Sequence, residues 1–317
     1  MNQSKRVTST NASFREEGVG DDERAGNDGG IETTQDSSSM GKQSLHDFNV
    51  DDYKSLEVCF RFLWIWVVFG YVLVPAYATF MDIDPKGLSP DEIAFGVLFA
   101  ELGKIITANA MLSSELGENA PLRRWSDAPA NDDGNNNVKI GLVFGSLACV
   151  VARLVDSLSD TGDAGGAVGI FGPILNGTTG TSVDVFCIIV ASVIIAPLTE
   201  ELFFRGFLLE ATRRRFQRGR SISNFESIEV SKGYIGSEEQ FSLAPDVLAV
   251  VLVSMMFAGV HFQPSDFPEL FVCGLCFGGV ALVGSRKRNR AISLTAPIIA
   301  HMTFNASVII EQVGMSN

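Results

Sequence analysis

Histidine, cysteine and basic charge are all scarce in this sequence of 317 residues. It contains 3 His and 5 Cys, and its 24 Lys and Arg are outnumbered by 37 Asp and Glu, which gives a formal net charge of -13. The acidic balance excludes nucleic acid as an expected partner, because phosphate-binding surfaces are basic. The scattered cysteines lack the framework of a disulfide-rich secreted domain. One pair, Cys273-x-x-Cys276, has an apolar setting and no second pair, which favours buried small side chains over a zinc site.

The first 57 residues have few aliphatic side chains and cannot bury enough apolar surface to fold. We predict that residues 1–57 form a disordered acidic tail, in which His46 is solvated. The tail has neither the apolar core of a secretory signal nor the acid-poor composition of a transit peptide. Residues 58–317 are predicted to form one membrane-embedded domain.

Beyond the tail, apolar runs recur at roughly 17 to 25 residues, the length that crosses a bilayer as a helix. Their number predicts an all-α fold, a multi-pass transmembrane helix bundle of about seven spans. The fourth run is overlong, and we expect a bend at Pro197. The predicted spans are residues 60–80, 92–112, 139–156, 183–212, 244–262, 267–285 and 291–313.

Lys and Arg gather in alternate loops between these runs, above all after the fourth and the sixth. The positive-inside rule then predicts an N-terminus on the cytosolic or stromal side and a C-terminus on the opposite side. The loop expected on the opposite side contains the acceptor sequon Asn176-Gly177-Thr178. Glycosylation there would indicate the endoplasmic reticulum, and its absence would leave a plastid or other membrane open.

Three ionisable side chains, Glu200, Glu201 and Arg205, lie inside the fourth apolar run. Ionisable groups at that depth are costly unless they are paired or line a polar cavity, so they are functional candidates. Glu201 and Arg205 are four residues apart and can form a structural ion pair. Glu200 is turned about 100° away and has no cation at i+3 or i+4. The ion-pair interpretation therefore leaves Glu200 unexplained.

Two further patterns concern packing. Glu101 and Lys104 in the second run are within pairing reach at i,i+3, and we expect a mutual ion pair, with a cavity-lining role as the alternative. Gly141-x-x-x-Gly145 and Gly274-x-x-x-Gly278 match the small-residue pattern of close helix contacts, expected here within the chain.

The other two histidines also fall in apolar runs. His261 ends the fifth run, and His301 in the seventh is followed four residues later by Asn305 on the same helical face. We expect His301 and Asn305 to present N–H groups to a shared oxygen. At about 1.5 Å per residue, Glu200, His261 and His301 lie roughly 20, 22 and 16 Å from the positive edges of their spans, near one level. Pro197 and Pro297 each precede polar residues by one turn, where they would bend the helix around a cavity.

In their order along the chain, these motifs resemble those of the CPBP family, which comprises type II CAAX prenyl proteases and bacteriocin-processing, immunity and lysostaphin-resistance-like proteins. The matching residues are Glu200-Glu201-x-x-x-Arg205, Phe257-x-x-x-His261 and His301-x-x-x-Asn305. The resemblance covers residues 140–313. It implies a glutamate-dependent intramembrane endopeptidase that acts on a membrane-associated or lipidated peptide or protein and is embedded in the lipid bilayer.

In the mechanism that the resemblance implies, Glu200 with His261 activates a water molecule, and His301 with Asn305 stabilises the oxyanion. Glu201 and Arg205 support the site by pairing, and no cofactor is required. Three alternatives stay open. A zinc metalloprotease would use the same residue types, although H-E-x-x-H is absent. A membrane adaptor or chaperone would use the polar cluster without catalysis. A transporter would be expected to show inverted repeats, which the sequence lacks.

Overall fold

The structure is a computed structural model, and it describes residues 52–73, 76, 88–117, 120–126, 133–159, 172–175, 177, 179–217, 243–286 and 293–314. The chain divides into two compact units, Met1–Ser44 and Leu45–Asn317, and all described residues belong to the second. Most of the predicted tail, the sequon at Asn176 and much of the basic loops therefore lie outside the described residues. The tail's expected last residues are helical, because the first helix begins at Asp52.

Every regular element in the described part of the chain is helical, so the all-α prediction is confirmed for these residues. Each of the seven predicted runs contains a helix. The elements are α1 (Asp52–Val67), η3 (Val68–Val72), α3 (Pro90–Leu116), α4 (Pro121–Ser126), α5 (Asp133–Ser159), α7 (Ser182–Ile189), η6 (Val190–Ile195), α8 (Ala196–Phe203), η7 (Phe204–Leu209), α10 (Leu243–Gly259), α11 (Phe267–Arg286) and α12 (Thr295–Gly314), where η denotes a π-helical segment.

Among the residues that the structure describes, three helical segments are long and apolar enough to cross a membrane, namely Pro90–Leu116, Asn135–Val155 and Ser182–Gln217. The apolar stretches Pro245–Gly259 and Phe267–Val283 are shorter. The structure thus supports the second, third and fourth predicted spans, and the count of seven stays a prediction.

The starts of two long helices follow directly from the local sequence. Ser89 caps α3 in a capping box, and its backbone N–H donates to the Glu92 carboxylate at 2.8 Å. Thr181 caps α7 in the same way with Asp184, whose carboxylate accepts from the Thr181 N–H at 2.7 Å. These caps satisfy N–H groups that would otherwise be left without partners at the helix ends.

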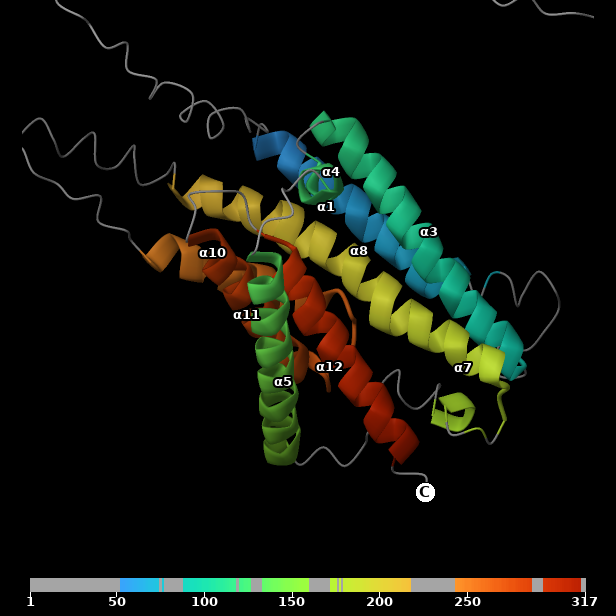
Figure 1. Ribbon diagram of the computed structural model, residues 1–317. Coiled ribbons are helices and arrows are strands. Elements are labelled where there is room, and N and C mark those ends of the chain that lie inside the picture. Colours follow the sequence, from blue (N-terminus) through green and yellow to red (C-terminus); the bar gives the residue numbers. More distant parts are fainter. Residues whose placement is uncertain are drawn as a thin grey trace, which may run out of the picture. The chain divides into compact units, whose positions relative to one another are not determined.

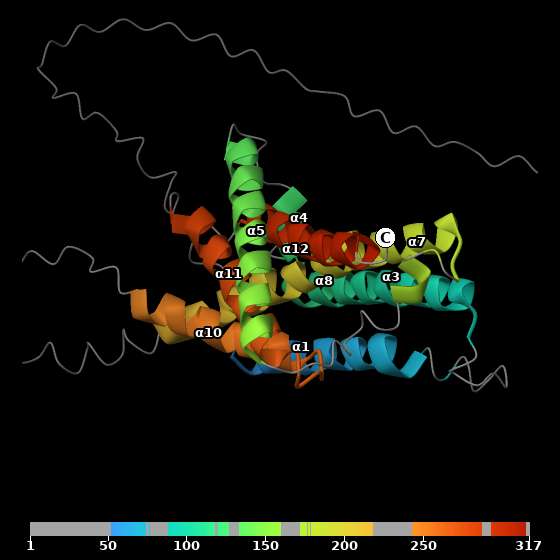
Figure 2. The same ribbon diagram turned by 90° about the horizontal axis from the view of Figure 1, so that it is seen from below.

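The helices form two groups that meet at the middle of the long α7–η6–α8–η7 segment. In Figures 1 and 2, α1 and α3 run alongside this segment, and α3 packs against α7, η6 and α8. On the other side, α12 packs against η6 and α8, and α5 packs across α12 and α11. Helix α10 packs on α11 and contacts η7. The centre of the long segment is therefore enclosed by helices from both halves of the chain.

The glycine patterns mark the closest of these helix contacts, as predicted. A Cβ added at Gly145 of α5 would lie 2.6 Å from the backbone oxygen of Ala300 in α12, and one at Gly141 would lie 2.7 Å from that of Ala296. A Cβ at Gly274 of α11 would lie 2.9 Å from Ser254 Cβ in α10. Only glycine lets these backbones approach so closely. The α5 contact holds α12 at the residue that precedes His301.

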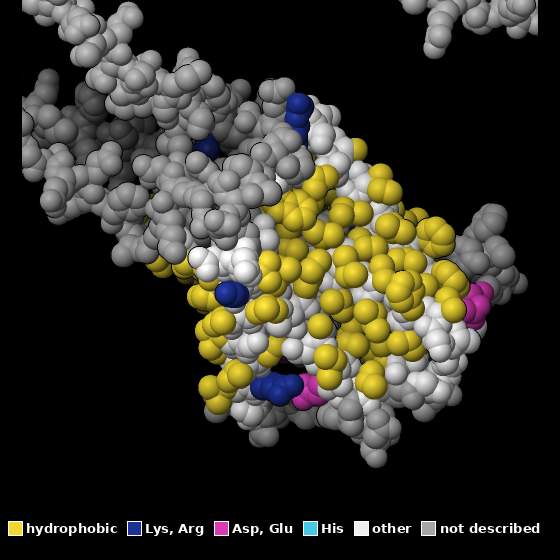
Figure 3. Space-filling view, viewed as in Figure 1, with side chains coloured by type: hydrophobic (Ala, Val, Ile, Leu, Met, Phe, Trp, Pro, Cys, Tyr) yellow, Lys and Arg dark blue, Asp and Glu magenta, His cyan; other side chains and the backbone are white. Residues whose placement is uncertain are grey.

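The outer surface of the helices is extensively apolar (Figure 3). Phe99 and Ile106 on α3 are 70% and 66% exposed, and Phe186 on α7 is 64% exposed. Apolar patches of this extent are typical of surfaces that face lipid or a partner. Charged side chains are turned inward instead: Lys104, Glu200, Glu201 and Arg205 are all buried. This inside-out distribution is expected of a protein that is solvated by hydrocarbon.

Candidate active site

Helix α8 carries the two adjacent glutamates between two π-helical turns. η6 precedes it, and Pro197 lies in its first turn, so the disruption predicted at this proline takes the form of a widened helical turn. Pro297 differs from the prediction, because it lies in the first turn of α12, where its missing N–H breaks no helical hydrogen bond. Pro297 therefore helps to start α12 and does not bend a span.

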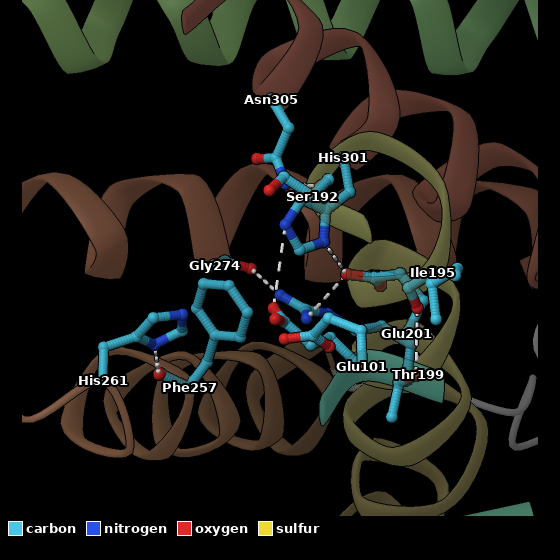
Figure 4. A network of polar contacts seen from close by, with 12 residues as sticks. Glu101, Ser192, Ile195, Thr199, Glu201, Phe257, His261, Gly274, His301 and Asn305 are labelled. Atoms are coloured by element: carbon cyan, nitrogen blue, oxygen red, sulfur yellow. Dashed lines mark hydrogen bonds and ion pairs between the residues drawn. The ribbon is translucent and has the colours of Figure 1, made fainter. Parts of the chain in front are cut away.

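Glu201 is held by two partners, of which the ion-pair interpretation predicted Arg205 but not His301. Its Oε1 accepts from Arg205 at 2.9 Å and from His301 Nδ1, also at 2.9 Å. Arg205 also donates to the Gly274 carbonyl oxygen at 3.2 Å, and its guanidinium lies 4.7 Å from the centre of the Phe257 ring. Glu201 and Arg205 are fully buried. This arrangement connects α8, η7, α11 and α12 and fixes the orientation of the His301 ring (Figure 4).

Glu200 is also buried, with 6% of its surface exposed, but it is bound differently. Its Oε2 lies 3.7 Å from His301 Nε2 and has no hydrogen-bond partner. A carboxylate oxygen without such a partner is costly inside a protein. Because His301 donates from Nδ1 to Glu201, its Nε2 is directed at Glu200. Glu200 and His301, two of the three residues expected near one level, thus lie beside each other, whereas the catalytic pairing of Glu200 with His261 stays a prediction.

The fifth predicted span, residues 244–262, placed His261 within a helix. In the structure α10 ends at Gly259, and His261 lies just beyond it. Its Nδ1 donates to the Phe257 carbonyl oxygen at 2.7 Å, which leaves an acceptor at Nε2 in the neutral ring. Tyr71 of η3 donates to the His261 carbonyl at 2.8 Å, and the next residue, Phe262, has a left-handed φ of 52°. The Phe257 ring contacts the rings of both His261 and His301, with centroid distances of 5.0 and 5.8 Å.

Asn305 has a hydrogen-bond partner that the sequence did not predict. Its Nδ2 donates one N–H to the Ser192 carbonyl oxygen in η6 at 2.7 Å, while His301 Nδ1 contacts Glu201, so the shared oxygen expected for Asn305 and His301 stays a prediction. In a π-helix, the N–H of residue i+5 bonds the carbonyl of residue i, and position 197 is a proline with no N–H. Pro197 therefore leaves the Ser192 oxygen free, and Asn305 satisfies it. The second N–H of the Asn305 amide stays available.

Glu101 and Lys104 of α3 form the predicted ion pair, between Glu101 Oε1 and Lys104 Nζ. Their side chains are only 14% and 7% exposed. Both interact electrostatically with Glu200 and with His261, so the pair belongs to the same polar interior as the motif residues. The sequence had offered this only as the alternative to a plain structural pair.

The formal charges of this interior nearly balance. Three carboxylates, of Glu101, Glu200 and Glu201, are accompanied by two permanent cations, Lys104 and Arg205. A net buried charge is strongly unfavourable, so one additional proton makes the cluster neutral. Glu200 Oε2 and His301 Nε2, 3.7 Å apart, are the groups beside each other that can hold it. A carboxylate and an imidazole that face each other are group types that general acid–base chemistry uses.

Among the described residues, the side chains of this cluster form no metal-ligand group and do not line the cavity between η3 and α3. Within the described ranges, no group of three His, Cys, Asp or Glu side chains is arranged to hold a metal ion. A cavity of about 530 Å³ lies between η3 and α3, where Phe69, Leu73, Phe95, Phe99 and Ala100 provide its apolar lining. None of the motif residues lines it.

Comparison with known proteins agrees with the geometry. Residues 182–307, from the start of α7 to the middle of α12, match a family model described as Rce1-like, type II CAAX prenyl endopeptidase. This segment contains all seven motif residues and excludes α1, α3 and α5. No curated protein and no solved structure matches the chain.

Proposed function

Residues 182–307 belong to the Rce1-like family of type II CAAX prenyl endopeptidases, and from this premise we propose that the chain is a glutamate-dependent intramembrane endopeptidase. Its substrate would be a membrane-associated peptide or protein, prenylated at a C-terminal C-a-a-X sequence. The observation that carries the proposal is the contrast between two adjacent carboxylates. Glu201 accepts two hydrogen bonds at Oε1, from Arg205 and His301, whereas the Glu200 carboxylate makes no hydrogen bond among the described residues and has only His301 Nε2 nearby, at 3.7 Å.

The free oxygen of Glu200 is suited to a general base. It would take a proton from a water molecule while the water oxygen bonds to the scissile carbonyl carbon. His261, with an acceptor at Nε2, would receive this proton from Glu200 and pass it to the leaving nitrogen as the C–N bond breaks, which leaves Glu200 ionised again. The second hydrogen of the water leaves with the product carboxyl group, and no other reactant is consumed.

His301 and Asn305 would stabilise the oxyanion of the tetrahedral intermediate. If the neutralising proton of the cluster resides on His301 Nε2, both ring nitrogens donate, one to Glu201 and one to the oxyanion. Asn305 is oriented by the Ser192 carbonyl and has one N–H left to donate. Glu201 and Arg205 contribute by fixing the His301 ring. Removal of one such oxyanion donor typically costs on the order of 10² to 10³ in turnover.

The proposal is tested with purified protein in liposomes and a quenched fluorescent peptide that ends in a farnesylated C-a-a-X sequence. We expect Glu200→Gln and His261→Ala each to abolish cleavage while the thermal unfolding midpoint shows a folded protein. Cleavage by either variant at the wild-type rate would contradict the proposal. Activity lost to a chelator and restored by added zinc would instead favour the metalloprotease alternative.

On the membrane side, we propose the orientation that the charge distribution favours, with the N-terminus in the cytosol or stroma. A C-a-a-X substrate is anchored by its prenyl chain and would approach from that side. Which organelle holds the protein is a separate question that depends on targeting.

A further inference from the structure

Two of the proposed catalytic groups, Glu200 and His261, make no direct polar contact in the described part of the chain. Glu200 and His261 have no mutual hydrogen bond or ion pair among the described contacts, although both are proposed to act on one water molecule. Each, however, interacts electrostatically with Glu101 and with Lys104. Helix α3, which carries this pair, lies outside the segment that matches the family model. The connection between Glu200 and His261 is thus provided by a helix that the family motifs do not include.

Only one of the two carboxylate oxygens of Glu101 has a partner among the described residues. Its Oε1 pairs with Lys104 Nζ, while its Oε2 is buried and has no hydrogen-bond partner. Figure 4 shows Glu101 reaching from α3 into the space between His261 and His301.

Glu200 Oε2 and Glu201 Oε2 are also buried without a hydrogen-bond partner among the described residues. Glu201 is already fixed through its Oε1 by Arg205 and His301. Glu101 Oε2 and Glu200 Oε2, in contrast, can together accept the two hydrogens that one water molecule donates.

Lys104 is placed so that it pairs with the Glu101 carboxylate and orients it. Its ammonium is buried, pairs with Glu101, and lies 4.6 Å from the centre of the Trp66 ring in α1. The Trp66 ring in turn contacts the His261 ring edge-on, at 5.9 Å between centroids. These contacts tie the ion pair to the His261 side of the cluster as well as to the Glu200 side.

We propose that Glu101 is a further catalytic residue of this site, which accepts the second hydrogen of the attacking water and links Glu200 to His261, with Lys104 as its positioning residue. This inference rests on the proposed function. The water is held by both hydrogens, so that its lone pair is free to face the scissile carbonyl. A proton taken up by Glu200 then has a carboxylate path to His261 and onward to the leaving nitrogen. Every proton on this path comes from the same water molecule.

The test separates this role from that of a buried ion pair. Exchanging the two charges in Glu101→Lys/Lys104→Glu retains an i,i+3 pair and the net charge but moves the carboxylate away from position 101. Removing both charges in Glu101→Gln/Lys104→Met avoids leaving one charge unpaired. The matched control is Arg153→Met/Glu311→Gln, which removes an exposed pair of 2.8 Å between α5 and α12.

With the farnesylated peptide as probe, we expect kcat of both α3 variants to fall by at least about tenfold while KM stays within about twofold, because general acid–base groups contribute to turnover. The control should keep wild-type kcat. If Glu200→Gln is inactive but the charge-exchanged variant keeps wild-type kcat, the role of Glu101 is overturned and the proposed function stands.

If the wild-type protein does not cleave the peptide, the proposed function fails for that substrate, and a second measurement still decides the role of Glu101. A crystal structure that resolves water should show one molecule within hydrogen-bond distance of both Glu101 Oε2 and Glu200 Oε2. Its loss is expected in Glu101→Gln/Lys104→Met. Protein donors bound to these two oxygens, in place of water, would overturn the proposal.

Discussion

Glu200 and Glu201 are neighbours in the sequence, yet the helix gives them different environments. A rotation of about 100° per residue directs Glu201 toward Arg205 one turn away, and toward His301 on α12. Glu200 faces His301 Nε2 from the other side, and its carboxylate makes no hydrogen bond among the described residues. One carboxylate therefore has a structural role, while the other is available for chemistry.

This difference predicts that Glu-to-Gln substitution changes the stability of the protein much more at position 201 than at position 200. Glu201→Gln leaves Arg205 buried without its counter-charge, which should destabilise the protein by about 3–5 kcal/mol. Glu200→Gln removes a charge that lacks a full partner, so its effect on stability should be much smaller. Thermal unfolding midpoints in detergent measure both, with Glu311→Gln as an exposed control. A larger loss for Glu200→Gln than for Glu201→Gln would show that the roles are reversed.

At the residue scale, spacing predicted the pair of Glu201 and Arg205 and the level shared by Glu200 and His301. It could not predict that Asn305 bonds a backbone carbonyl, because that oxygen becomes free only through the π-helical turn η6. It also placed His261 inside a helix that in fact ends at Gly259. Sequence spacing determines the face and depth of a residue. The contacts between helices and the end of a helix depend on packing.

At the scale of elements, the π-turn η6, Pro197 and Asn305 form one structural unit. Asn305→Ala should cost about 1–3 kcal/mol, because it leaves the Ser192 carbonyl unsatisfied. Pro197→Ala supplies an N–H at the position that bonds this carbonyl in a π-helix. The two substitutions together should therefore cost less than their sum, as measured by a double-mutant cycle of unfolding midpoints. Pro297→Ala, in the first turn of α12, should combine additively with Asn305→Ala.

The contact between α5 and α12 sets the position of His301. Gly145→Ala places a Cβ 2.6 Å from the Ala300 oxygen, so α12 must move. We expect a loss of about 1–3 kcal/mol in stability, and a loss of cleavage on the order of 10²-fold if the histidine shifts by about 1 Å. Gly279→Ala in α11 is the matched control, since a Cβ there meets nothing within 4 Å. Equal activity of the two variants would mean that this contact does not position the site.

Elements were the most predictable level of this structure, and the reason is physical. Seven apolar runs each become a helix, because in hydrocarbon every backbone N–H and C=O must be bonded within the segment. The way in which the helices meet was predictable only at the glycines, where small residues mark close approach. The rotation of α3 that turns Glu101 and Lys104 toward the site left no such mark, since any inward face of that helix could have carried an ion pair.

For the molecule as a whole, an apolar exterior and a charged interior indicate solvation by lipid, but they do not count the membrane crossings. Three segments meet the length and composition of a span. Helices α10 and α11 are shorter in their apolar parts, and they pack against each other around the turn that follows Gly259. At about 1.5 Å per residue, α10 with 17 residues covers roughly 25 Å, close to the hydrocarbon thickness.

We predict that α10 and α11 form a hairpin that crosses the membrane twice. A glycosylation acceptor inserted at Pro264, in a variant with Asn176→Gln, should be modified in microsomes, whereas one near the N-terminus should not. The reason is the basic residues that precede α10 and follow α11, which favour the side of the N-terminus. The sequon at Asn305, inside α12, serves as an internal control and should stay unmodified. If the acceptors at Pro264 and near the N-terminus show the same glycosylation, the turn between α10 and α11 and the N-terminus lie on the same side, and the hairpin does not cross the membrane. His261 would then approach the site from that side.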